Sequence, residues 1–136
     1  MVRLIMSGSG EGKTKQLLEL MNAAADTETG CMVCIEPTRN MSFSLRHQTR
    51  LVDASEFGID SFECLRGFIC GMYAGNYDIS HVFVDNLCKV AHDTDERNVG
   101  AFLNWMEKFC APLNLKITVT VSGDPGSATD TMRKYM

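Results

Sequence analysis

A run of small residues near the N-terminus has the composition and spacing of a phosphate-binding loop. Residues 7–14 read SGSGEGKT, between the apolar run VRLIM and the amphipathic run QLLELM. The last three residues match the pattern G-x-x-x-x-G-K-[ST], and Ser7 stands in place of its first glycine. Glycines let backbone N–H groups curl around an anion without side-chain clashes. In that chemistry Lys13 would contact the β- and γ-phosphates of a nucleotide, and the Thr14 hydroxyl would bind Mg²⁺.

The sequence on either side of this loop supports the same interpretation. An expected strand ends before the loop and an expected helix follows it, and the N-terminus of a helix adds partial positive charge where an anion would bind. A glycine- and serine-rich hairpin or linker is the alternative, and it does not require that context. The predicted phosphate-binding residues are Ser7, Gly8, Ser9, Gly10, Glu11, Gly12, Lys13 and Thr14.

A magnesium site at a nucleotide needs a further oxygen ligand, and Asp85 can supply it. It follows the apolar run HVFV, which has the form of a Walker B motif. The alternative is an aspartate that caps a turn at the end of a strand. Thr14 and Asp85 are therefore the predicted metal ligands.

Strands alternate with helices along the chain, which predicts an α/β fold: a five-stranded, mainly parallel sheet with helices on both faces. Ligands of such sheets bind beyond the carboxyl ends of the strands. Polar residues stand at those ends, namely the 7–14 loop, Glu36, Asp53, Asp85 and Ser122. The expected strands are 2–6, 31–36, 49–54, 81–85 and 116–122, and the expected helices are 14–24, 61–74, 98–110 and 127–135.

Length and composition limit the class of protein. The 136 residues predict a single nucleotide-binding domain, 1–136, and the net charge of −4 argues against nucleic acid as a partner. No apolar run approaches about 18 residues and no signal-peptide pattern is present, so neither a membrane span nor secretion is expected. The six cysteines lack zinc-site spacing, which predicts buried free thiols in a reducing cytoplasm.

Together these motifs resemble a RecA-like ATPase core of the P-loop NTPase superfamily, over residues 1 to about 122. The resemblance implies ATP as the nucleotide, Mg²⁺-dependent hydrolysis, and the spatial strand order 3-2-4-5-1 in chain numbering. It also implies that Lys13 and Glu36 act in catalysis, Glu36 by activating the attacking water. By the same resemblance, Ser122 would sense the γ-phosphate. No N-K-x-D motif for reading guanine is present, which agrees with ATP.

Two alternatives remain open. The P-loop, the EPTR run at 36–39 and Asp85 also resemble thymidine-kinase-like proteins, which would make the chain a nucleoside or nucleotide kinase. Those enzymes carry a glutamate after the aspartate, where this chain has Asn86. The other alternative is a slowly hydrolysing, nucleotide-dependent switch that acts on a partner surface. A homo-oligomer and an unidentified protein partner both stay open.

Overall fold

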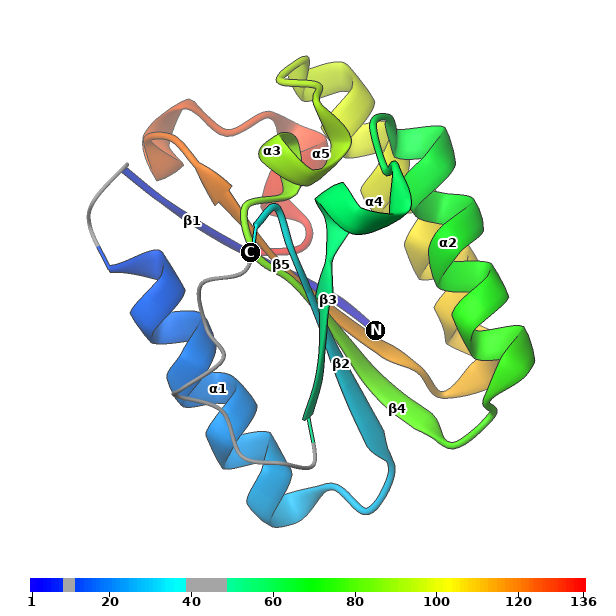
Figure 1. Ribbon diagram of the computed structural model, residues 1–136. Helices are drawn as coiled ribbons and strands as arrows, with labels where there is room; N and C mark the ends of the chain where they lie inside the picture. Colours follow the sequence, from blue (N-terminus) through cyan, green and yellow to red (C-terminus); the bar gives the residue numbers. More distant parts are fainter. Residues whose placement is uncertain (9–11, 39–48) are drawn as a thin grey trace.

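The computed structural model describes residues 1–8, 12–38 and 49–136. Within them, five strands form one sheet in which every neighbouring pair is parallel (Figure 1). The order across the sheet is β1-β5-β4-β2-β3. The predicted α/β class, the parallel sheet and the strand order are thus confirmed. The strands are β1 Val2–Ser7, β2 Cys31–Glu36, β3 Thr49–Asp53, β4 Ile79–Val84 and β5 Lys116–Ser122.

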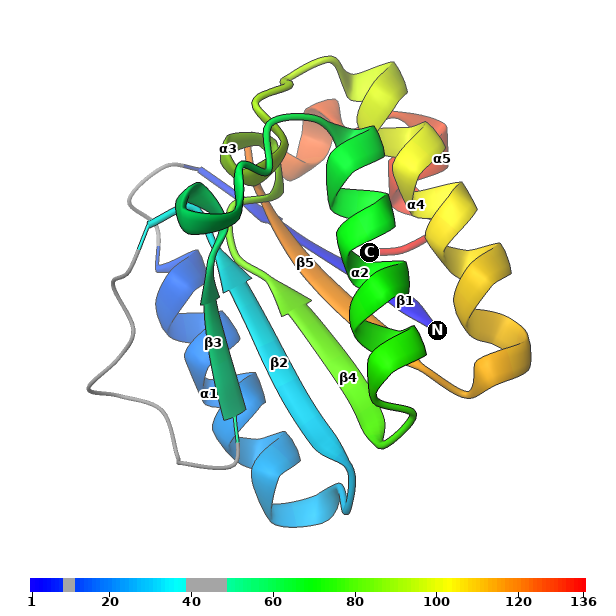
Figure 2. The ribbon, with the colours of Figure 1, turned by 45° about the vertical axis from the view of Figure 1, so that its right-hand side comes forward.

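Helices cover both faces of the sheet, as predicted. Helix α1 lies on one face, and α2 and α4 lie side by side on the other (Figure 2). Each face has its own hydrophobic cluster in the described residues. The helices are α1 Lys13–Thr27, α2 Phe62–Gly75, α3 Leu87–Ala91, α4 Glu96–Cys110 and α5 Asp130–Arg133. Short 3₁₀ turns occupy Ala54–Phe57, Ala111–Leu113 and Pro125–Ser127.

Alternation along the strands divides the apolar side chains between these two clusters, because successive side chains of a strand point to opposite faces. On β1, Leu4 and Met6 join the larger cluster, while Ile5 packs with Leu17 and Met21 of α1. Leu17 and Met21 are fully buried and one helical turn apart, so they fix the face of α1 that meets the sheet. This packing sets where the N-terminus of α1 lies.

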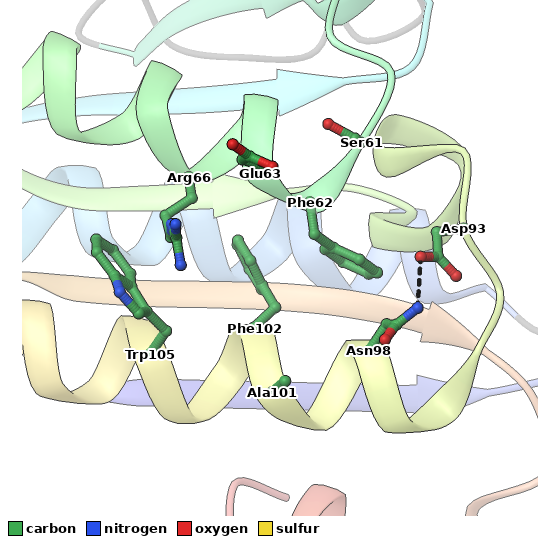
Figure 3. A pocket seen from close by; sticks show the side chains of 9 residues that line it. All are labelled: Ser61, Phe62, Glu63, Arg66, Asp93, Asn98, Ala101, Phe102 and Trp105. Carbon is green, nitrogen blue, oxygen red and sulfur yellow. Dashed lines mark hydrogen bonds between the residues drawn. The ribbon is translucent and has the colours of Figure 1, made fainter.

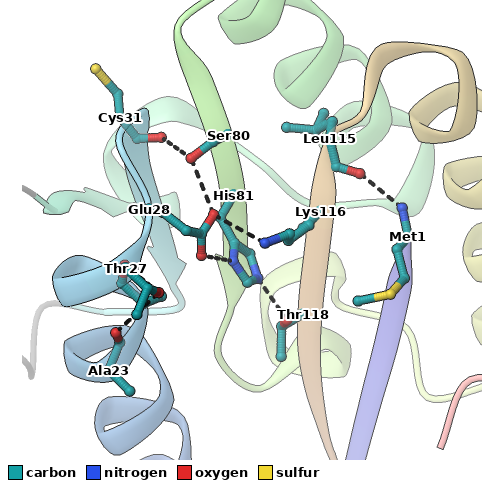
Figure 4. Close-up of polar contacts among 11 residues, drawn as sticks. Met1, Ala23, Thr27, Glu28, Cys31, Ser80, His81, Leu115, Lys116 and Thr118 are labelled. Atoms are coloured by element: carbon teal, nitrogen blue, oxygen red, sulfur yellow. Dashed lines mark hydrogen bonds and ion pairs between the residues drawn. The ribbon is translucent and has the colours of Figure 1, made fainter.

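A polar cluster fastens the other end of α1 to the sheet (Figure 4). Glu28, the C-cap residue of α1, accepts a hydrogen bond from His81 Nδ1 on β4 at 2.9 Å. His81 Nε2 lies 2.8 Å from the Thr118 hydroxyl on β5. Lys116 Nζ lies 3.6 Å from the Glu28 carboxylate. Apolar packing and this cluster together hold α1 across β4 and β5.

The C-terminal helix differs from its prediction. We expect a helix over 127–135 opened by Ser127, but α5 spans only Asp130–Arg133, with Thr129 as its N-cap. Pro125 instead begins a 3₁₀ turn capped by Asp124, and the Ser127 hydroxyl donates to the Asp124 carbonyl at 2.8 Å. Residues 125–127 therefore form the turn that Asp124 and Pro125 favour, and Ser127 does not begin the helix as the pattern predicts.

Other differences are small. Asp95 caps α4, so this helix begins at Glu96 rather than at 98, and the short helix α3 has no counterpart in the expected elements. All six cysteines are free. The expected burial is confirmed for Cys34 and Cys110 and is wrong for Cys31, which is exposed; the other three are partly buried. None of the helices in the described ranges is both long and apolar enough to cross a membrane.

Candidate functional site

The polar strand ends predicted from the sequence meet at the carboxyl edge of the sheet. Ser7 and Ser122 are directly opposite each other at the ends of β1 and β5. Ile35 pairs with Val84, which places Glu36 and Asp85 side by side at the ends of β2 and β4. The backbone N–H of Asp85 donates to the Ile35 carbonyl at 2.9 Å, so the pairing continues to this position.

The turn into α1 requires a glycine. Gly12 is the N-cap and has φ 80° and ψ 21°, in the left-handed region that glycine adopts without cost. Its carbonyl accepts the Gln16 N–H at 2.9 Å, the first turn of the helix. Lys13 and Thr14 therefore lie in the first turn, where backbone N–H groups have no helical partner. Ser9, Gly10 and Glu11, also predicted to bind phosphate, lie outside the described residues.

The structure brings Thr14 and Asp85 together. The Thr14 hydroxyl lies 3.2 Å from Asp85 Oδ2 and 3.4 Å from Oδ1. Asp85 is 8% exposed. A hydroxyl and a carboxylate at this separation are two oxygen donors of the kind that Mg²⁺ binds alongside water and phosphate oxygens.

A threonine that the sequence reasoning missed holds Asp85 in place. Thr120 is fully buried, and its hydroxyl donates to Asp85 Oδ1 at 3.0 Å. The Thr120 hydroxyl oxygen also accepts the Asn86 backbone N–H, at 2.8 Å. Thr120 thus fixes both the carboxylate and the turn that follows it. The signal was the alternation in KITVTVS, where a hydroxyl recurs every second residue on the face toward α1.

Glu36 is the second buried carboxylate of the site, at 1% exposed. Its neighbour on the same face of β2 is Cys34. Burial raises the pKa of the Cys34 thiol well above its ordinary value, and the charges of Asp85 and Glu36 raise it further. The two carboxylates and the thiol thus lie close enough to interact electrostatically, and a bound cation would stabilise the carboxylates.

Asp53, at the end of β3, stabilises the turn that follows the strand. Its carboxylate accepts the Ser55 N–H at 3.0 Å and the Ser55 hydroxyl at 2.6 Å, and it caps the 3₁₀ turn Ala54–Phe57. It pairs in register with Glu36, one strand farther from Asp85. Of the acids at these two strand ends, Glu36 is the one adjacent to the Thr14–Asp85 contact.

Lys13 lines a cavity of about 400 Å³ at the carboxyl ends of β1 and β5. The residue is 8% exposed, and nothing in the described part of the chain forms an ion pair or a side-chain hydrogen bond with its ammonium. Ser122 also lines this cavity. The Ser7 side-chain oxygen is buried, with no hydrogen-bond partner in the described ranges. A buried cation without an internal partner favours an anionic ligand, since burying a charge alone is costly.

The residues present fit a magnesium ion held jointly by protein and nucleotide. The described residues contain no group of three or more His, Cys, Asp or Glu side chains that could hold a metal. Mg²⁺ is usually bound through one or two carboxylates plus substrate phosphates, with water completing the shell. Thr14 and Asp85 match that arrangement and do not match a closed, all-protein metal cage.

A second hollow, of about 580 Å³, lies between α2 and α4 (Figure 3). Phe62, Phe102 and Trp105 line it, and the Arg66 guanidinium lies 4.7 Å from the centre of the Trp105 ring. It shares no lining residue with the cavity on Lys13. It is therefore separate from the candidate site.

Comparison with known proteins does not name a family for this chain. No protein family matches the sequence, and no curated protein is similar to it.

Proposed function

We propose that the chain is a P-loop protein that binds ATP and hydrolyses it with Mg²⁺, in the manner of RecA-like ATPases. The observation that carries the proposal is the contact between the Thr14 hydroxyl and the Asp85 carboxylate at 3.2 Å. A P-loop threonine and a Walker B aspartate hold one Mg²⁺ between them in such proteins, so they must lie within one coordination shell. The sequence pairs these two motifs because one Mg²⁺ needs ligands from both, and this contact supports the pairing.

In this proposal the 7–14 loop encloses the phosphates and Lys13 neutralises the β- and γ-phosphates. The burial of Lys13 without an internal counter-ion supports that role, because the bound anion would supply the missing charge. Ser122 lies on the same cavity, where it could donate a hydrogen bond to the γ-phosphate. Magnesium, when bound, would offset charge on the phosphate oxygens.

Hydrolysis also needs a group that orients water toward the γ-phosphate or accepts its proton. Glu36 is the candidate, since it lies at the strand end beside Asp85. Asn86, which follows Asp85, cannot take this role because an amide is not a useful base. Asp53 is committed to its cap.

Two measurements test the proposal. Calorimetry measures the binding of ATP and of a non-hydrolysable analogue, each with and without Mg²⁺, and a phosphate-release assay measures hydrolysis. We expect nucleotide binding that depends on Mg²⁺. The bound nucleotide should also stabilise the fold: at 100 times its dissociation constant, a ligand adds about 2.7 kcal/mol to the free energy of unfolding. Absence of nucleotide binding would overturn the proposal. Tight binding without phosphate release would instead support the nucleotide-dependent switch.

Phosphoryl transfer to a small acceptor is the second candidate function. The specific observation is the size of the cavity on Lys13, about 400 Å³, which lies in the range of about 300–1,000 Å³ typical of small-molecule pockets. In a transfer, the acceptor oxygen would form the new bond to phosphorus as the bridge to ADP breaks. Phosphate that appears on an added acceptor, rather than in solution, distinguishes this function from hydrolysis.

A further inference from the structure

The hollow between α2 and α4 has no part in the proposed function, but its lining is that of a protein-binding surface (Figure 3). The rings of Phe62 and Phe102 lie 5.2 Å apart between the two helices, and Trp105 extends the aromatic surface along α4. Phe102 is buried, whereas Phe62 and Trp105 are only partly covered by the rest of the chain. Partly exposed aromatic side chains around a hollow of about 580 Å³ indicate a surface that a partner covers.

Arg66 is oriented at the edge of this aromatic surface. Its guanidinium lies 4.7 Å from the centre of the Trp105 ring, a cation–π contact that holds the side chain and leaves its N–H donors available. No carboxylate in the part of the chain that the structure describes forms an ion pair with it. Arg66 therefore presents an oriented, unpaired cation to whatever covers the hollow.

Glu63 presents an unpaired anion beside it. It lies one helical turn before Arg66 on α2, lines the same hollow and is exposed. Among residues 1–8, 12–38 and 49–136, no cationic side chain pairs with it. Asp93 also lines the hollow, but its carboxylate already accepts hydrogen bonds from the Asn98 side chain and the Asp95 N–H, each at 2.9 Å. Glu63 is thus the carboxylate of the hollow that is available to a partner.

A cation and an anion one turn apart on the same helix make this surface complementary to itself. In a two-fold symmetric dimer, the same patch of both copies meets, so each contact between two different residues occurs twice. If the α2 helices of two copies lie antiparallel across the hollow, Glu63 of each copy faces Arg66 of the other. Two equivalent ion pairs then form together, and neither charge is left beside a like charge.

We propose that this hollow is a dimerisation surface and that its occupant is α2 of a second copy of the chain. The ridge of side chains on α2 packs into the groove between α2 and α4 of the other copy, and Ala101, small and exposed on α4, leaves room for it. The covered aromatic side chains supply affinity, and the two ion pairs fix the orientation. Dimerisation through this hollow does not require nucleotide, because the hollow shares no lining residue with the cavity on Lys13.

The test is sedimentation equilibrium of the full chain over a wide range of protein concentration. We expect a monomer–dimer equilibrium. Glu63→Arg and Arg66→Glu should each weaken dimerisation about tenfold or more, since either reversal places like charges together at both ion pairs. An equimolar mixture of the two variants should restore association to within about threefold of the wild type, because one copy then carries both cations and the other both anions.

Ala101→Arg tests the same surface without changing either charge. It places a long side chain in the hollow from an exposed position, so it should weaken dimerisation about tenfold or more in a variant that still folds. Ala23→Arg, at an exposed position of α1, is the matched control and should dimerise like the wild type. Urea unfolding confirms that each variant is folded. A wild type that stays monomeric overturns the proposal, and so does a dimer that Ala101→Arg leaves intact. Failure of the mixed charge variants to associate, when each is folded, also overturns it.

Discussion

The hydroxyl of Thr14 lies 3.2 Å from Oδ2 of Asp85, although 71 positions separate the two residues in the sequence. Thr14 is placed by the first turn of α1, and Asp85 is placed by the end of β4 and by the Thr120 hydroxyl behind it. The contact therefore depends on both the packing of α1 and the strand order. In the proposed function it marks the position of the magnesium ion.

Asp85→Asn tests this position. An amide oxygen is a weaker Mg²⁺ ligand than a carboxylate, so the variant should lose most of the increase in nucleotide affinity that Mg²⁺ provides. Metal-free affinity should change little. Nucleotide titrations with and without Mg²⁺ measure both quantities, and Asp60→Asn, at an exposed position of the same charge, is the control. A wild-type response to Mg²⁺ in Asp85→Asn would place the metal elsewhere.

Lys13→Ala tests the phosphate contact. Charge-assisted hydrogen bonds contribute roughly 1.5–3 kcal/mol, so nucleotide affinity should fall about tenfold or more. The ligand-free variant should be no less stable than the wild type, because the substitution removes a buried charge that has no partner in the described residues. Lys15→Ala, at the exposed neighbour, should leave affinity unchanged. Calorimetry and urea unfolding give the two readouts, and unchanged affinity in Lys13→Ala would reject the P-loop assignment.

The strands were predictable because each is a short apolar run that ends in a turn residue or a polar side chain, whereas their order came from the resemblance to RecA-like ATPases. Leu17 and Met21, one helical turn apart, and Ser61, which caps α2, are sequence features typical of the helices α1 and α2. The last helix was not predictable in the same way. Ser127 and Thr129 are both good caps, and the choice between them depends on the preceding turn at Asp124 and Pro125.

Individual strand-end residues of the site were predictable, but their connections were not. Asp85 and Glu36 stand out as charges after apolar runs. Thr120 does not, since a threonine is ordinary in a strand, and its bond to Asp85 depends on the pairing of β4 with β5. The role of Asp53 as a cap likewise depends on the turn that follows it.

His81 should make stability pH-dependent. Burial lowers the pKa of His81 below its ordinary value of 6.5, Lys116 and the N-terminal ammonium lower it further, and the Glu28 carboxylate opposes them without reversing the shift. The unfolded chain thus binds more protons than the native state between the two pKa values, so the free energy of unfolding rises with pH there. The contribution of His81 to the free energy of unfolding should be complete above about pH 6.5. On acidification it should fall by at most about 1.4 kcal/mol for each unit that separates the native and unfolded pKa values.

Urea unfolding at pH 7.5 and pH 5.5 measures this dependence. His81→Gln should show a smaller loss of stability at the lower pH than the wild type. His92→Asn is the control, since His92 is exposed and asparagine tolerates its left-handed backbone. An equal loss in His81→Gln and the wild type would assign the pH dependence to other groups, such as the carboxylates.

In the proposed function, Glu36 is the residue on which hydrolysis of bound ATP depends. Its carboxylate is 1% exposed and lies beside Asp85, so it is held close to the expected γ-phosphate. Glu36→Gln keeps the shape of the side chain and removes its basicity. It should therefore bind ATP and Mg²⁺ normally and release phosphate about 100- to 10,000-fold more slowly, the range for a positioned acid–base group. Single-turnover phosphate release, measured beside binding by calorimetry, separates the two effects. Asp53→Asn is the matched control: asparagine can still cap Ala54–Phe57 through its amide oxygen, so stability should change little and turnover should stay intact. Undiminished hydrolysis in Glu36→Gln, with loss of hydrolysis in Asp53→Asn, would transfer the role to Asp53.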